Sequence, residues 1–92
     1  EDHKNYNIQK GDTEGIVNYG LSMSHIQCSA FFREDGDIVK ISFRSKDDYD
    51  VNEFARKYFN GGGHINAAGG MSNDSLEITI DKFKKIIVSQ ND

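Results

Sequence analysis

The chain has 92 residues, which is enough for a single domain with one modest hydrophobic core. Its formal net charge of −4 excludes a protein that coats nucleic acid through a broadly basic surface, although a few well-placed cations can still hold one nucleotide or one chain end. The single cysteine, Cys28, excludes a disulfide framework and a cysteine-type zinc site. We therefore expect a buried, inert thiol in a cytoplasmic protein.

No segment approaches the ~20 apolar residues of a membrane span, and no signal peptide is visible. The polar residues 1–12 predict an irregular lead-in, and the chain opens without Met, as an excised domain would. The next segment predicts a short helix that begins at Asp12 or Thr13 as its cap. Its apolar residues are Ile16, Val17 and Leu21.

A β-hairpin is the clearest local pattern. Residues 25–34 and 37–45 flank Asp35-Gly36, the dipeptide favoured in two-residue type I′ turns. With Glu34 opposite Asp37, one face of the hairpin is apolar and belongs in the core, through the pairs of Phe32 with Val39, Ala30 with Ile41, and Cys28 with Phe43. The other face is polar and basic, through the pairs of Phe31 with Lys40, Ser29 with Ser42, and Gln27 with Arg44.

Helical spacing returns after the hairpin. Residues 51–59 predict a helix with Asp50 as N-cap and Glu53 in a variant of the capping box. It ends at Asn60 and three glycines. His64 to Ala68 predicts another short helix, because alanine is a good helix former.

The last segment, 75–88, is open to two interpretations, because residues 75–80 also alternate as a strand would. A helix is favoured, with Ser75 or Asp74 as cap and one apolar stripe formed by Leu76, Ile80, Phe83 and Ile87. The element order indicates an α/β (α+β) fold in which a small mixed β-sheet with a β-hairpin is flanked by three or four helices.

The glycine run is a candidate ligand site. Gly61, Gly62 and Gly63 let the backbone approach a ligand closely. Amides at the start of a following helix, with the positive end of its dipole, would bind an anion, and His64 would donate a hydrogen bond to it. The alternative is a flexible connector between helices, and the glycines lack the P-loop pattern that would decide between the two.

A second candidate is the polar strand segment that contains Lys40, Ser42, Arg44 and Ser45. Arginine suits bidentate contact with phosphate, and the small serines leave room for a ligand. The alternative is a solvated strand face with scattered charges. A metal site is not expected, because His3 and His25 have no carboxylate or cysteine at ligand spacing.

These two segments resemble a known family. Gly61 to Gly69 resembles the Gly-Gly-Gly-His-x-x-Ala-Ala-Gly signature of the DHH-associated domain, which follows the catalytic DHH domain in a superfamily of phosphoesterases. Lys40 to Ser45 resembles the family's K-x-S-x-R-S strand. The segment from Gly11 to Tyr19 is most similar to the bifunctional oligoribonuclease and adenosine bisphosphate (pAp) phosphatase branch, or nano-RNases, formerly labelled exopolyphosphatase-related. The resemblance covers about residues 10–88 of one domain that spans 1–92.

The resemblance implies a domain that clamps substrate over a manganese site in a preceding DHH domain. Arg44 and Ser45, with Ser42 and Lys40 beside them, would contact phosphate or base. The phosphate would also be held by Asn66 and by the glycine–histidine segment, Gly61, Gly62, Gly63 and His64. One departure is Asn60, which stands where many relatives have a further glycine.

The Asp-His-His metal motif of the catalytic domain is absent, since Asp2-His3 is followed by Lys4. The resemblance therefore implies a hydrolase as parent protein, but no catalytic residue, metal or cofactor in this chain. Its implied partners are its own N-terminal DHH domain and a short oligonucleotide or nucleotide, without a membrane, and it is compatible with a homodimer of the full-length protein. Two alternatives remain: a tRNA-binding module, as in alanyl-tRNA synthetase, and an interaction domain without a ligand.

Overall fold

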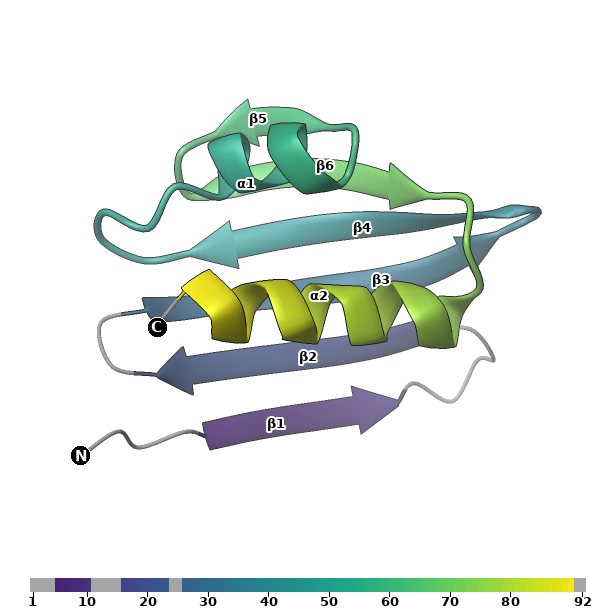
Figure 1. Cartoon of the computed structure of the whole chain (residues 1–92), viewed down its shortest axis with the longest axis horizontal. Helices are drawn as coiled ribbons and strands as arrows, with labels where there is room; N and C mark the ends of the chain where they lie inside the picture. The colour runs from purple at the N-terminus through teal and green to yellow at the C-terminus, as the bar shows by residue number, and fades with distance from the viewer. Residues whose placement is uncertain (1–4, 11–15, 24–25, 91–92) are drawn as a thin grey trace.

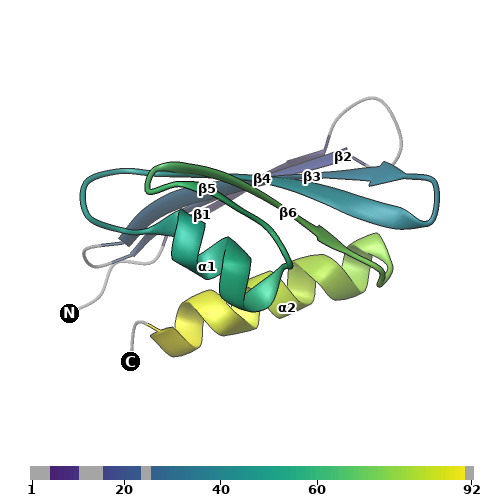
Figure 2. The same ribbon diagram turned by 90° about the horizontal axis from the view of Figure 1, so that it is seen from above.

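The structure is a computed structural model that describes residues 5–10, 16–23 and 26–90. It has two layers, a six-stranded sheet in the order β1-β2-β3-β4-β6-β5 and two helices that both lie on one face of it (Figures 1 and 2). The elements are β1 (Asn5–Lys10), β2 (Ile16–Met23), β3 (Ile26–Asp35), β4 (Ile38–Ser45), α1 (Val51–Tyr58), β5 (Gly62–His64), β6 (Ala67–Ser72) and α2 (Leu76–Gln90). In the described residues, neither helix is long and apolar enough to cross a membrane.

The predicted α+β class is confirmed, but two details of the expectation are wrong. Every neighbouring pair of the described strands is antiparallel, so the sheet is not mixed. The described residues form two helices instead of three or four. The lower number of helices arises because two segments expected to be helical are strands.

The N-terminal segments are the first of these corrections. Residues 5–10 form β1, where an irregular lead-in was expected, and Ile16–Met23 forms β2, where a helix was expected. Val17 and Tyr19 are buried while Asn18 between them is exposed, which is the two-residue alternation of a strand. The proposed caps Asp12 and Thr13 lie outside the described residues.

The hairpin forms with the predicted faces but with a shifted register. Asp35 pairs with Ile38, so the two turn residues are Gly36 and Asp37 instead of Asp35 and Gly36. Gly36 has φ 65 at the first turn position, where a type II′ turn places glycine. Each strand keeps its own alternation, so the predicted core set is still buried: Cys28, Ala30, Phe32, Val39, Ile41 and Phe43.

Both helices have the predicted caps. The Asp50 carboxylate accepts a hydrogen bond from the amide of Glu53 at 3.0 Å, and α1 ends before Asn60, which has φ 56. Asparagine is one of the few residues that adopts this left-handed conformation at little cost, so it replaces a glycine there. The Ser75 hydroxyl accepts from the amide of Ile78 at 3.2 Å at the start of α2, which confirms the helix over the strand alternative.

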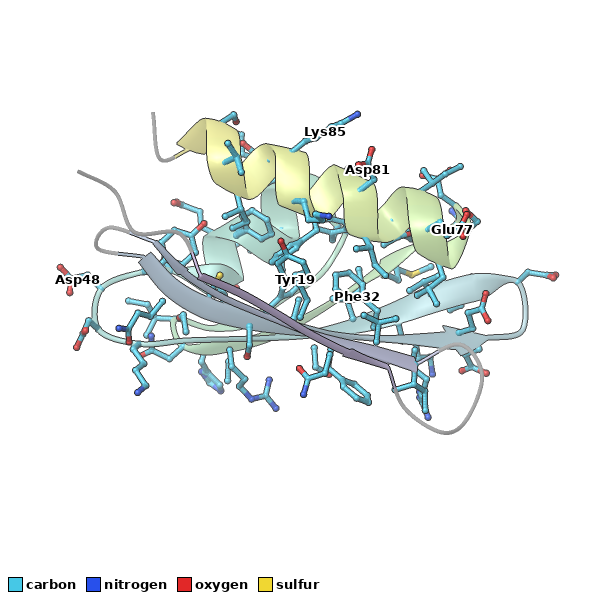
Figure 3. The ribbon with its side chains drawn as sticks, turned by 90° about the horizontal axis from the view of Figure 1, so that it is seen from below. Tyr19, Phe32, Asp48, Glu77, Asp81 and Lys85 are labelled. Carbon is cyan, nitrogen blue, oxygen red and sulfur yellow. The ribbon has the colours of Figure 1, made fainter. Side chains whose placement is uncertain are left out.

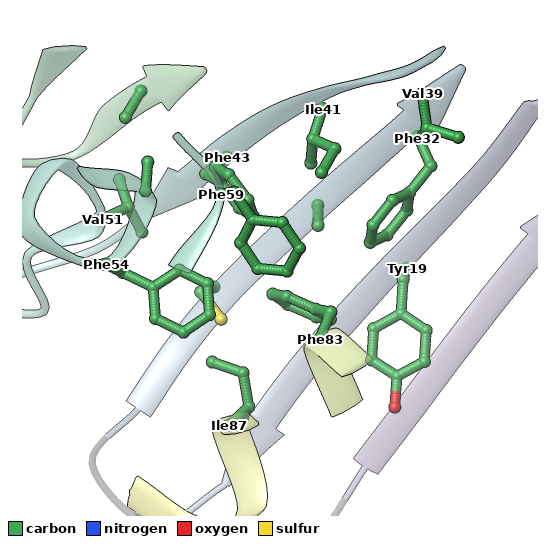
Figure 4. Packing of buried hydrophobic residues seen from close by; sticks show 14 residues of the cluster. Tyr19, Phe32, Val39, Ile41, Phe43, Val51, Phe54, Phe59, Phe83 and Ile87 are labelled. Atoms are coloured by element: carbon green, nitrogen blue, oxygen red, sulfur yellow. The ribbon is translucent and has the colours of Figure 1, made fainter. Parts of the chain in front are cut away.

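The core lies between the sheet and the two helices (Figure 4). Phe83 of α2 is its centre, with ring centroids 5.6 Å from Tyr19 and Phe32 in edge-on geometry and 5.8 Å from Phe54 of α1. Ile87, one turn further along α2, is also buried. The predicted stripe of α2 therefore packs on the inner face of the sheet, and neither of the described helices lies over the opposite face (Figure 2).

The segment after the glycines is the remaining correction. His64 to Ala68 does not form a helix, because Gly62–His64 is β5 and Ala67–Ser72 is β6. Ala68 pairs with Phe43 of β4 and is buried, so a non-local strand pairing overrides the helical preference of the two alanines. The hairpin of β5 and β6 extends the sheet beside β4.

Candidate functional site

The face of the sheet turned away from the helices, here called the outer face, carries many of the predicted site residues. Figure 3 shows the helices on one side of the sheet, with Tyr19 and Phe32 pointing toward them, and further side chains on the other side. On β4 the burial alternates, so Lys40, Ser42 and Arg44 are exposed between buried residues. These three residues therefore lie on the outer face.

Arg44 and His64 share one row of the outer face. Arg44 pairs with Ala67 of β6, and Ala67 pairs with His64 of β5. Residues directly opposite on neighbouring strands project from the same face, so these three form one row, here called the Arg44 row. Two strand spacings separate Arg44 from His64, about 10 Å between their backbones, and only a methyl group stands between them.

The next row consists of Ser42, Gly69 and Gly62 and is here called the glycine row. Its members have small side chains or none, so the sheet is hollowed there. The hollow has a volume of about 560 Å³, in the range of small-molecule sites. Its lining includes Phe31, Arg33, Lys40 and Met71 as larger side chains around the glycine row.

Phe31 and Arg33 were not among the predicted site residues. Phe31 pairs with Ser42, and Arg33 pairs with Lys40, so both lie on the outer face beside predicted residues. The signal was available in the sequence, because alternation along β3 places Phe31 and Arg33 on the polar face of the hairpin. A large aromatic side chain on an otherwise polar strand face indicates a candidate ligand contact.

Two cations of the outer face, Lys40 and Arg33, act on one carboxylate, Asp35. Lys40 forms an ion pair with Asp35 at 3.0 Å, and both side chains are about half exposed. The hydrogen bond from Lys40 and its charge hold the pKa of Asp35 below its ordinary 3.8, and Arg33 contributes in the same direction. Among the described strand residues that alternate onto this face, three cations stand against Asp35, so the face is positive although the chain is acidic.

The backbone amides of Gly61 and Gly63 are already hydrogen-bonded within the fold, and a strand instead of a helix follows the glycine run. Gly61 N–H donates to the Ala55 carbonyl at 3.1 Å, and Gly63 N–H donates to Asn52 Oδ1 at 2.8 Å. The expected anion site at a helix N-terminus is therefore absent in this segment. A Cβ at Gly61 would collide with the Gly69 carbonyl oxygen, so the glycines allow close packing of backbone on backbone.

Ser45 and Asn66 make internal hydrogen bonds. The Ser45 hydroxyl donates to the Tyr49 carbonyl at 2.6 Å and accepts from Asn66 Nδ2 at 2.9 Å. Asn66 Nδ2 also donates to the Asp47 carbonyl at 3.2 Å. These bonds tie the turn that follows β5, and hence His64, to the end of β4 next to Arg44.

The described residues contain no cluster of three His, Cys, Asp or Glu side chains suited to a metal ion. The donors of this part of the chain therefore do not fit a manganese site; His3 and His25 lie outside it. Cys28 is buried, as expected, and burial raises its pKa to about 12, which disfavours the reactive thiolate.

Comparison with protein families matches residues 3–90 to the DHHA1 domain, which agrees with the resemblance of the glycine–histidine segment. Domains of this family are associated with DHH-family phosphoesterases and typically sit with a DHH catalytic domain. No curated protein and no solved structure matches the chain. Because the match spans nearly the whole sequence, the chain belongs to the DHHA1 domain family.

Proposed function

We propose that this domain binds the phosphate of a nucleotide or short oligoribonucleotide and holds it for the DHH catalytic domain of the parent phosphoesterase. The Arg44 row carries the proposal, because a guanidinium and an imidazole flank a methyl group on an open face. Both are hydrogen-bond donors to phosphate oxygens, and arginine binds them with two donors at once. Neither residue is buried, so both are accessible to a ligand.

The surroundings of the row support an anion as the ligand. The glycine row beside it leaves space above the sheet, and the cations Lys40 and Arg33 border that space. Ser45 and Asn66 act as positioning residues in this proposal, because their hydrogen bonds fix the turn that carries His64. Gly61 and Gly63 contribute close packing in this proposal, since their amides donate within the fold.

The finer assignment follows the nano-RNase branch. We propose short oligoribonucleotides and nucleoside bisphosphates as substrates of the parent protein, with manganese held by the DHH domain and not by this chain. A site that binds one phosphate group through the Arg44 row, here called the phosphate grip, does not need a basic surface, which fits the net charge of −4. A tRNA-binding module would instead bind folded tRNA more tightly than a dinucleotide, and a gel shift against a dinucleotide titration separates the two.

The phosphate grip is tested by calorimetric titration of the chain with adenosine bisphosphate. Arg44→Ala and His64→Ala are each expected to weaken binding by about 1–3 kcal/mol, the usual range for a hydrogen bond to a charged group. Lys85→Ala is the matched control, because it removes an exposed cation from α2, on the other side of the molecule (Figure 3). Equal affinity in the wild type and both site variants contradicts the proposal.

A further inference from the structure

Phe31 is a large apolar side chain at the middle of the outer face. It is 40% exposed, while its neighbours Ala30 and Phe32 are fully buried. Its strand partners are Asn18 on β2 and Ser42 on β4, neither of which covers an aromatic ring. Among the described residues, the close ring pairs lie on the core side and none of them includes Phe31. The exposed ring therefore has no evident role in the core.

The ring borders a flat and open part of the sheet. Beyond Ser42 in the same row come Gly69 and Gly62, so no side chain larger than a serine stands between Phe31 and the edge strand. This shelf is the floor of the 560 Å³ hollow. A planar group lying on Phe31 can extend over the glycine row without steric obstruction.

Positive charge lies on both sides of the ring. Arg33 is two residues further along β3, and Lys40 pairs with it on β4. Arg44 pairs with Ser29, two residues from Phe31 in the other direction. Each step of two residues is about 7 Å along a strand. An aromatic ring between cations, above small residues, suits a flat base attached to a phosphate backbone, and proteins that bind single strands use this combination.

We propose that Phe31 stacks on a nucleobase, so that the outer face binds single-stranded oligonucleotide and not only an isolated phosphate. This inference rests on the proposed function, because the Arg44 row supplies the phosphate contact from which the base is reached. Arg33 and Lys40 contact the phosphate backbone of the same oligonucleotide. A protein partner is the competing occupant; the excess of cations over the one carboxylate, Asp35, favours the polyanion.

The test is a titration of the chain with a 5′-phosphorylated oligoadenylate and, separately, with ribose phosphate, which lacks a base. Phe31→Leu keeps an apolar side chain and removes the ring. We expect it to weaken oligoadenylate binding by at least about fivefold, the lower end of measured stacking contributions, and to leave ribose phosphate binding unchanged. Phe31→Tyr retains the ring and should bind like the wild type.

Ile78→Ala is the matched control, because Ile78 is 57% exposed on α2, in the helical layer. Its oligoadenylate affinity should equal that of the wild type. The inference is overturned if the wild type does not bind oligoadenylate, or if Phe31→Leu binds it with wild-type affinity. It is overturned as well if Phe31→Leu weakens the binding of ribose phosphate as much as that of oligoadenylate. It is also overturned if the substitution weakens only association with the DHH domain, since the ring is then a protein contact.

The same titrations separate failure of this inference from failure of the phosphate grip. Arg44→Ala is expected to weaken both ligands, because both carry a phosphate. If Arg44→Ala leaves ribose phosphate binding unchanged, the proposed function fails. If Arg44→Ala weakens both ligands but Phe31→Leu binds oligoadenylate like the wild type, the phosphate grip stands and the stacking role is refuted.

Discussion

At the scale of single residues, burial governs the chemistry of Cys28 and Tyr49. Burial raises the pKa of Cys28 from 9.0 to about 12. The pKa of Tyr49 is raised as well, mainly by burial and further by Cys28. A raised pKa means that the folded protein keeps a proton that the unfolded chain has lost. The contribution of Cys28 to stability is therefore complete below pH 9.0 and is lost as the pH rises toward about 12.

Urea unfolding at two pH values tests this sign. Between pH of about 8 and about 10, the free energy of unfolding of the wild type should fall by about 1 kcal/mol more than that of Cys28→Ala, because one pKa unit corresponds to about 1.4 kcal/mol. Burial, the main cause of the raised pKa of Tyr49, acts in both proteins, so this part of its contribution cancels. The same pH dependence in both proteins contradicts the buried thiol.

Two glycines in the same region should respond differently to a methyl group. A Cβ at Gly61 would overlap the Gly69 carbonyl oxygen and lie 2.6 Å from Gly70 Cα, so Gly61→Ala is expected to destabilise the fold by about 1–3 kcal/mol. A Cβ at Gly69 would lie 3.5 Å from the Ile41 carbonyl oxygen, an ordinary contact. Gly69→Ala should therefore change the stability by less than about 0.5 kcal/mol. Chemical denaturation of both variants checks the contrast, and equal losses would refute it.

At the scale of elements, β5 is held in place by α1. Gly63 N–H donates to Asn52 Oδ1 of α1, and Val51 N–H donates at 2.8 Å to the Ile65 carbonyl in the turn after β5. The side chain of Asn52 thus takes the role that a further strand would have at this edge. It fixes the strand that carries His64.

Asn52→Ala is expected to cost about 1 kcal/mol of stability, since it leaves the Gly63 amide without its partner. Amide hydrogen exchange at Gly63 and His64 should accelerate. Asp50→Ala serves as the control: it removes the cap of the same helix at a similar cost, but should leave exchange in β5 unchanged. Exchange in β5 that is insensitive to Asn52→Ala would show that this contact does not hold the strand.

The elements that the sequence predicted well are those set by local rules. The two helices and their caps depend on residues within a few positions, as with Asp50 and Ser75, and the faces of the hairpin depend only on alternation. The predicted hairpin register was wrong because the turn lies one residue later, with Gly36 at its first position instead of its second. Each residue of β3 therefore pairs with a residue two positions further along β4 than predicted, and both faces keep the same residues.

The elements that were missed depend on distant partners. β6 is a strand because it pairs with β4, more than twenty residues earlier, and not because of its own alanines and glycines. β1 is likewise defined by its pairing with β2. For the site, the resemblance implied that Arg44 and His64 contact the same phosphate. The expected anion site of glycine amides was wrong, because the fold uses the amides of Gly61 and Gly63 internally. A strand pairing between distant segments cannot be predicted from the few residues around each position.

At the scale of the whole molecule, many of the described carboxylates lie in turns and loops and not in the strand rows of the outer face. Asp47 and Asp48 lie in the loop after β4, and Asp74 lies in the loop before α2. The outer face carries Arg33, Lys40 and Arg44 against Asp35. An acidic chain can therefore present one cationic face, which reconciles the net charge with an anionic ligand.

An amide chemical-shift map of the chain titrated with adenosine bisphosphate would locate the phosphate site directly. We expect the largest shifts at Arg44, Ala67, His64 and Gly69, no shifts in α2, and loss of the response in Arg44→Ala. Shifts centred on the helical layer, or an unchanged map in Arg44→Ala, would contradict a phosphate site on the outer face.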